Sequence, residues 1–179
     1  MRLLLLRHAK SDWGDSTLAD VDRVLNGRGK AAARQMGSYL QQNTLFPNRI
    51  LCSTAQRTRE TLSRVLPFLP HEAQIHLISD FYRKSDISYT NLIRRYGGHS
   101  QVLMIIGHNP ATEQTAEELV GTGASDVRDD MLAKYPTAAL AVIDFDISEW
   151  ADLRAGTGHL ERFVKPRELN LPPETDSIR

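Results

Sequence analysis

The sequence predicts an α/β fold, a three-layer α/β/α sandwich with a mostly parallel central sheet. Apolar runs of strand length alternate along the chain with segments of helical periodicity. Residues 3–6 and 102–106 are apolar throughout, as strands buried on both faces are. No internal repeat, low-complexity tract or linker interrupts the alternation, so we expect a single domain over residues 1–179.

The expected elements follow in order. Strands are expected over residues 3–6, 49–52, 74–79, 102–106, 138–145 and 159–164. Helices are expected over about 30–42, over about 58–66, from about 86 to 96, and from 110 to about 121. Polar turns are expected over 150–158, and the tail from residue 165, which contains Pro166, Pro172 and Pro173, is expected to be irregular.

Capping residues mark several of these helix boundaries. The segment Leu25-Asn26-Gly27 offers an N-cap for the first helix, and Asp86 has the place of an N-cap before the third. Asn109 is expected to cap the fourth, with Pro110 at its first helical position. Pro67 is expected to stop the second.

Composition excludes several classes of function. The 22 basic residues balance the 22 acidic ones, so we expect no general attraction to nucleic acid or to a membrane surface. The four leucines near the start are too few for a signal peptide, and no apolar run approaches a membrane span, so we expect a cytoplasmic protein. Cys52 is the only cysteine, and its place in an apolar run favours a buried structural role.

Two histidines and two arginines follow the central strands. Arg7 and His8 come after the first strand, Arg57 falls in the first turn after the second, and His108 comes after the fourth. Because ligands of open α/β sheets bind beyond the carboxyl ends of the strands, these side chains are expected to form one cationic pocket. A chain of zero net charge that concentrates cations in this way is expected to bind an anion locally.

Such a pocket suits a phosphoryl group. Arginine pairs with two phosphoryl oxygens at once and keeps its charge at physiological pH. A histidine at the end of a rigid strand can act as a nucleophile when one ring nitrogen is bonded and the other is free. The other four histidines are assigned structural or surface roles: His71, His76, His99 and His159. No metal-ligand spacing and no Gly-rich phosphate loop is present, so neither a metal nor another cofactor is expected.

Four motifs resemble those of the histidine phosphatase superfamily, also called phosphoglycerate mutase-like. They are Leu-Arg-His-Ala-Lys-Ser at residues 6–11, Asp-Arg-Val-Leu-Asn-Gly-Arg-Gly at 22–29, Ser-Thr-Ala-Gln-Arg-Thr-Arg-Glu-Thr at 53–61 and Gly-His-Asn-Pro at 107–110. Each is weak alone, but all four occur in the family's order and at its usual separations. The resemblance covers residue 2 to about 121.

The resemblance implies a metal-independent phosphatase in which His8 is phosphorylated during turnover. Arg7, Arg57 and His108 would complete the phosphate pocket. Ala9, where mutase members usually carry glycine, and the short chain are most similar to the SixA-like phosphohistidine phosphatases. The family's phosphate-binding asparagine is replaced by Gly14.

The general acid that many members carry after the third strand is also missing, because residues 73–112 contain no glutamate. Asp80 is the candidate general acid there, and a plain loop aspartate is the alternative reading. His108 is another candidate proton donor. An alcohol leaving group needs such an acid, whereas the imidazole released from phosphohistidine can take its proton from solvent. A site without a dedicated acid therefore favours phosphohistidine on a protein as substrate.

Two alternatives remain open. One is an enzyme for small phosphate esters, including a mutase, and the other is a non-catalytic binder of phosphate or of a phosphoprotein. The sequence leaves the oligomeric state open.

Overall fold

A computed structural model describes residues 1–169 of the chain. Its strands are β1 (Arg2–Arg7), β2 (Arg49–Ser53), β3 (Gln74–Ile78), β4 (Val102–Gly107), β5 (Val120–Gly123), β6 (Leu140–Asp144) and β7 (Gly158–Val164). Its α-helices are α1 (Gly27–Gln42), α2 (Gln56–Val65), α3 (Asp80–Arg83), α4 (Thr90–Tyr96), α5 (Ala111–Leu119) and α6 (Ser125–Ala133). Single 3₁₀ turns lie at Asp20–Asp22, Leu66–Phe68, Trp150–Asp152 and Pro166–Glu168.

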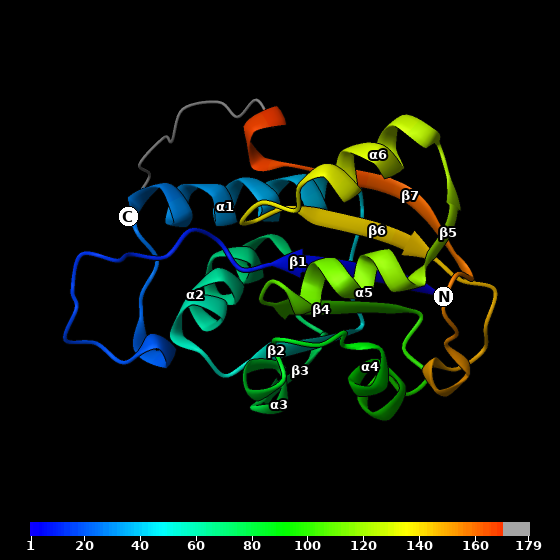
Figure 1. Ribbon diagram of the computed structural model, residues 1–179, viewed down its shortest axis with the longest axis horizontal. Helices are drawn as coiled ribbons and strands as arrows, with labels where there is room; N and C mark the ends of the chain where they lie inside the picture. The colour runs from blue at the N-terminus through cyan, green and yellow to red at the C-terminus, as the bar shows by residue number, and fades with distance from the viewer. Residues whose placement is uncertain (170–179) are drawn as a thin grey trace.

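The strands form one sheet in the order β3-β2-β4-β1-β6-β7-β5 (Figure 1). β3, β2, β4 and β1 pair in parallel, and so do β7 and β5. β6 is antiparallel to both of its neighbours, β1 and β7. The expectation of a mostly parallel sheet is therefore confirmed, and the directions of the last strands are now assigned.

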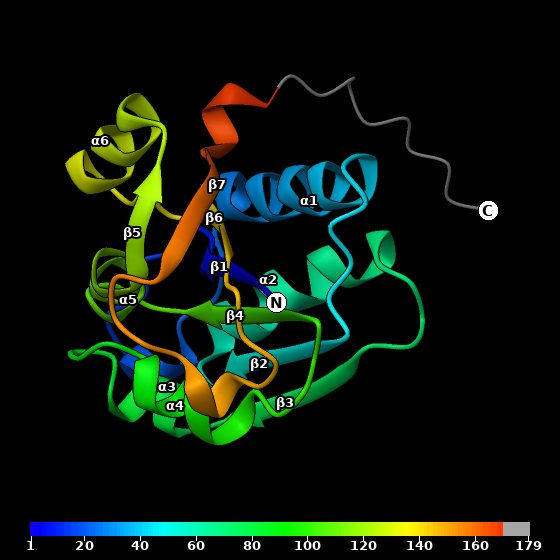
Figure 2. The ribbon, with the colours of Figure 1, turned by 90° about the vertical axis from the view of Figure 1, so that its right-hand side faces the viewer.

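Apolar strands bury both faces of the sheet. In β1, Leu3 and Leu5 join the core under α3, α4, α5 and α6, while Leu4 and Leu6 join the core under α1 and α2. All four leucines are fully buried. Figure 2 shows α1 and α2 on one side of the sheet and α5 and α6 on the other. The three-layer sandwich follows from this alternation of side chains. None of the helices within residues 1–169 combines the length and apolar character needed to cross a membrane.

The start of α1 agrees with its expected cap, and two other caps were wrong. The Asn26 side chain accepts a hydrogen bond from the Gly29 N–H at 2.9 Å. Asp86 does not cap α4, because that helix begins only at Thr90. The backbone N–H of Tyr89 donates to the Thr115 hydroxyl and not to a carbonyl of an earlier helical turn.

Asn109 does not cap α5 either. The helix begins at Ala111, and the Asn109 amide donates to Glu113 and to the Tyr135 carbonyl, both at 3.2 Å.

Three elements were not expected from the sequence: α3, β5 and α6. The helix expected to run to about residue 121 ends at Leu119, and the chain continues as β5, which pairs with β7. Of the tail, Pro166 lies in a 3₁₀ turn, and Pro172 and Pro173 lie outside the described residues.

Close packing of α1 against the loop after β1 requires glycine at position 29. A Cβ built on Gly29 would lie 2.0 Å from the Lys10 carbonyl oxygen and 2.9 Å from the Lys10 nitrogen. Both atoms are backbone, so neither can move aside without shifting the segment that follows His8. A Cβ built on Gly27, in the same helix, meets nothing within 4 Å.

We expect Gly29→Ala to lower the free energy of unfolding by about 1–3 kcal/mol, the usual cost of overpacking. Gly27→Ala is the matched control and should be neutral or stabilise by up to about 1 kcal/mol, because alanine favours a helix. Urea unfolding of the three proteins measures both effects. Equal stabilities of the two variants would contradict the close approach of Gly29 to Lys10.

Candidate active site

The carboxyl ends of β1 and β4 place two histidines side by side. The parallel register pairs Arg7 with Gly107, so His8 and His108 are each the next residue after a paired strand end. The His8 N–H continues the ladder by donating to the Gly107 carbonyl at 2.9 Å. The two imidazole ring centroids are 5.1 Å apart.

A backbone hydrogen bond orients the His8 ring. Nδ1 of His8 lies 2.7 Å from the Ala9 carbonyl oxygen, which only accepts, so Nδ1 carries the proton and donates it there. The Nε2 lone pair is thereby left for other chemistry. The Ala9 peptide is itself fixed, because its N–H donates to the Thr61 hydroxyl at 3.0 Å.

Burial and cationic neighbours keep both imidazoles neutral. Desolvation lowers the pKa of His8 to about 3, and the charges of Arg57 and Arg7 act in the same direction. Desolvation also lowers the pKa of His108 to about 2, with further lowering from His8 and Arg57. At neutral pH His8 therefore has the unprotonated nitrogen that a nucleophile needs.

Two arginines flank His8. Arg57, in the first turn of α2, donates to the Asp20 carbonyl oxygen at 2.6 Å and to Asp20 Oδ2 at 3.0 Å. Arg7 donates through Nη1 to the Tyr135 carbonyl at 2.7 Å. Its Nε is buried and has no hydrogen-bond partner within residues 1–169. Each guanidinium is thus fixed at one edge.

His108 has one bonded and one unbonded ring nitrogen. Its Nε2 lies 2.8 Å from the Ser53 hydroxyl, whereas its buried Nδ1 has no partner in the described part of the chain. Ser53 Oγ already accepts from the Ala55 N–H at 3.3 Å, which frees the Ser53 proton for Nε2. In that arrangement Nδ1 carries the ring proton and is an unpaired donor.

Asp20 is a site residue that the sequence analysis missed. Besides its two bonds from Arg57, its carboxylate accepts from Arg23 at 2.9 Å and from the Tyr82 hydroxyl at 3.1 Å. Partial burial of Asp20 opposes ionisation, but the charge of Arg57 and the hydrogen bonds from these partners outweigh it and hold the pKa below its usual value. An anion thus already occupies one side of the Arg57 guanidinium.

Arg23 fixes the loop that carries Asp20. It donates to the Asp12 carbonyl at 3.0 Å and to the Ser11 hydroxyl at 2.6 Å, as well as to Asp20, and it is 8% exposed. Arg23 lies in the motif at residues 22–29, and this motif was the signal in the sequence that could have placed the loop at the site. A cavity of about 460 Å³ opens here, and among its lining residues are Arg7, His8, Asp20, Arg23 and Arg57.

The structure therefore brings Arg7, His8 and Arg57 to one cavity, with His108 against His8. It does not bring Asp80 there: that carboxylate lies at the start of α3, 3.3 Å from the Lys84 ammonium, and does not line the cavity. The four histidines that were assigned structural or surface roles are exposed. Cys52 is fully buried, and desolvation raises its pKa to about 12. Within residues 1–169, no group of three metal-ligating side chains is close enough to hold a metal ion.

Comparison with known proteins supports the family that the sequence motifs indicate. The family model described as histidine phosphatase superfamily (branch 1) matches residues 3–82. An uncharacterised chloroplast protein of Arabidopsis thaliana is 37% identical over 180 residues, covering 92% of this chain and 78% of that protein. An uncharacterised protein of Mycobacterium tuberculosis is 32% identical over 164 residues, covering 90% of this chain and all of its own.

Solved structures agree at the level of the fold. A candidate phosphohistidine phosphatase SixA from Agrobacterium tumefaciens superposes with a TM-score of 0.77 at 31% identity, covering 92% of this chain and 97% of that one. The protein histidine phosphatase SixA bound to tungstate superposes with a TM-score of 0.69 at 20% identity, covering 95% and 100%. From its motifs, fold and relatives, this chain belongs to the SixA-like branch of the histidine phosphatase superfamily and is a metal-independent phosphatase.

Proposed function

We propose that the protein removes phosphoryl groups from phosphohistidine on proteins, through a phosphorylated His8. The observation that carries the proposal is the His8 ring. Its Nδ1 is tied to the Ala9 carbonyl, its pKa is lowered to about 3, and it lines a cavity with two arginines. A neutral, oriented imidazole beside two guanidinium groups fits attack on a phosphoryl group.

The reaction has two displacements at phosphorus. In the first, the His8 Nε2 lone pair forms a P–N bond while the P–N bond of the substrate breaks, and the departing imidazole keeps that electron pair and takes a proton. In the second, water attacks the phosphorus, the bond to His8 breaks, and phosphate leaves with neutral His8 restored. In both steps the transition state resembles metaphosphate, and Arg7 and Arg57 stabilise the negative charge on its phosphoryl oxygens.

The unpaired donors suit those oxygens. Nδ1 of His108 and Nε of Arg7 are buried without partners in the described residues, and a buried donor without a partner costs about 1–3 kcal/mol. A phosphoryl oxygen that reaches either group would recover that energy. A phosphoryl group that takes both ends of the Arg57 fork would replace two oxygens of Asp20, the backbone carbonyl oxygen that Nη1 now bonds and the carboxylate Oδ2 that Nη2 now bonds.

Protonation of the leaving group favours phosphohistidine over an alcohol ester. Asp20 is held ionised by its cationic partners, which makes it a poor acid. The role of Asp80 as general acid stays a prediction, and its ion pair with Lys84 outside the cavity gives that role no support. Imidazole, unlike an alkoxide, can leave with a proton taken from solvent. The SixA candidate from Agrobacterium tumefaciens, at 31% identity, supports the same substrate class.

The test is a substrate panel. We expect a phosphohistidine peptide to be hydrolysed with a higher kcat/KM than p-nitrophenyl phosphate or an alkyl phosphate. His8→Ala should lower that rate by at least about 10³-fold, as loss of a nucleophile does. Asp80→Asn should leave phosphohistidine hydrolysis within about twofold, since no acid is required. Liberated phosphate measures all three.

Faster turnover of an alkyl phosphate than of the peptide would favour the small-molecule phosphatase instead. Tight binding of phosphate with no turnover of any substrate would favour the non-catalytic binder. A large loss in Asp80→Asn, restricted to alkyl phosphates, would establish Asp80 as the acid for that class.

A second prediction concerns Ser53, which we propose as a positioning residue for His108. Ser53→Ala removes the hydroxyl that fixes the ring and its tautomer, so kcat should fall by about tenfold while KM changes less. Ser63→Ala, on the exposed side of α2, is the matched control and should leave both constants unchanged. A rise in KM with kcat unaltered would show that Ser53 serves ground-state binding only.

A further inference from the structure

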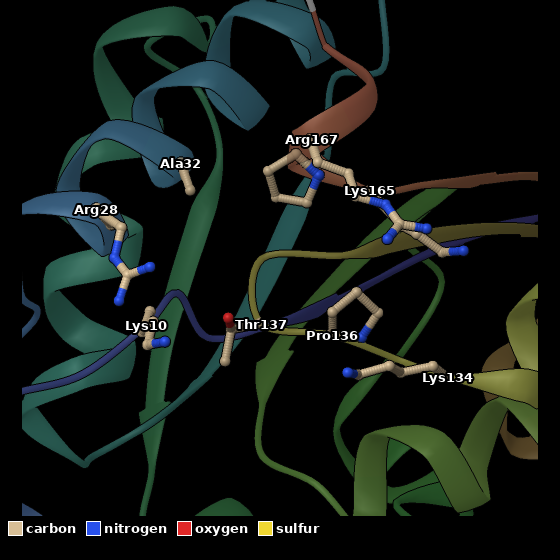
Figure 3. Close-up of a pocket in the computed structure, with 9 residues that line it drawn as sticks. Lys10, Arg28, Ala32, Lys134, Pro136, Thr137, Lys165 and Arg167 are labelled. Atoms are coloured by element: carbon tan, nitrogen blue, oxygen red, sulfur yellow. The ribbon is translucent and has the colours of Figure 1, made fainter.

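A second pocket lies beside the phosphate cavity, and basic side chains surround it. It has a volume of about 250 Å³ and lies between the start of α1, the segment before β6 and the segment after β7 (Figure 3). Four residues line both this pocket and the phosphate cavity: Lys10, Lys134, Pro136 and Thr137. We call this pocket the basic groove. Because the two share a wall, a ligand with its phosphoryl group at His8 can extend into the basic groove.

Three of the five basic side chains that line the groove have no ion pair in the described part of the chain. Lys10, Arg28 and Lys134 are exposed, and none of them forms an ion pair with a carboxylate within residues 1–169. The other two differ: Lys165 is buried and paired with Asp130 and Glu168, and Arg167 is paired with Glu168. The chain as a whole has no net charge, so this concentration of free cations is a local feature.

The cations do not converge on one point. Figure 3 shows Lys10 and Arg28 on one side of the groove and Lys134 and Lys165 on the other. Ala32, Pro136 and Pro166 contribute apolar surface to the same groove. A single phosphate ion would need donors aimed at one position. Separated cations around an apolar surface instead suit an extended ligand with several carboxylates and an apolar side chain.

We infer that the basic groove binds an acidic peptide segment, with an apolar residue, that flanks the phosphohistidine of the protein substrate. The inference rests on the proposed function for its link to catalysis. Carboxylates of the segment would pair with Arg28 and Lys134, and its apolar side chain would contact the proline rings. The groove thereby selects which phosphohistidine reaches His8, and His8 supplies the chemistry.

The experiment compares two phosphohistidine peptides that differ only in the flank. One flank carries several glutamates and a leucine, and the other carries glutamines in place of the glutamates. At low ionic strength we expect kcat/KM to be about tenfold higher for the acidic peptide, because several exposed ion pairs together contribute that much binding. Added salt should reduce that ratio. Arg28→Gln combined with Lys134→Gln should lower the ratio to about 1–3.

Lys30→Gln is the matched control. Lys30 is an exposed cation two residues beyond Arg28 in α1, but it does not line the groove. This substitution should leave the ratio at its original value. An equal loss in Lys30→Gln and in the double variant would overturn the inference, because it would assign the preference to general charge. So would equal kcat/KM values for the two peptides in the unaltered protein.

A binding measurement separates this inference from the proposed function. Fluorescence anisotropy of the unphosphorylated peptides needs no turnover, and the acidic peptide should bind the full chain more tightly than the glutamine peptide. If no phosphohistidine peptide is hydrolysed, the proposed function fails and this binding still decides for or against the groove. Two results would overturn the acidic-peptide assignment. One is that neither peptide binds, and the other is that a fluorescent adenosine triphosphate binds whereas the peptides do not.

Discussion

The parallel pairing of β1 with β4 is the constraint on which the rest of the site depends. Their register sets Arg7 opposite Gly107, and the His8 N–H extends the ladder by one further bond. A shift of one residue would turn His8 towards the opposite face, because side chains alternate along a strand. The eight apolar side chains of residues 3–6 and 103–106 prevent that shift, since all are buried in the two cores. Core packing thus determines the position of the candidate nucleophile.

Electrostatics at this edge follows from burial more than from net charge. The chain is neutral overall, yet desolvation and two arginines keep His8 unprotonated. The same arginines would repel a charged imidazole and attract a phosphoryl group, so one arrangement serves both the nucleophile and its substrate. Asp20 balances part of this positive charge from a loop that Arg23 holds in place. The basic groove extends the positive potential beyond the cavity.

Strong sequence patterns allowed much of this to be predicted. Continuous apolar runs mark β1 and β4, and the histidines and arginines follow strand ends, where α/β sheets place ligands. The elements that were missed have weak patterns. β5 has glycine at two of its four positions, and only Met131 is buried in α6, so neither gives a clear periodicity.

Long-range contacts account for the missed site residues. Asp20 meets Arg57 across 37 positions of sequence, and Ser53 meets His108 across 55. No local pattern reports such a contact, because it depends on how loops pack after the sheet has formed. The N-cap expected at Asp86 failed for a similar reason: the Tyr89 N–H bonds to Thr115, 26 residues away.

Chemical trapping of the phosphorylated protein tests the central claim most directly. Rapid alkaline quenching of the protein during turnover of a phosphohistidine peptide, followed by peptide mass spectrometry, would locate the phosphoryl group. The account predicts an acid-labile, alkali-stable phosphoryl group on His8, formed and lost at rates that match turnover. A phosphoryl group on another residue, or phosphate release with the protein never phosphorylated, would contradict it.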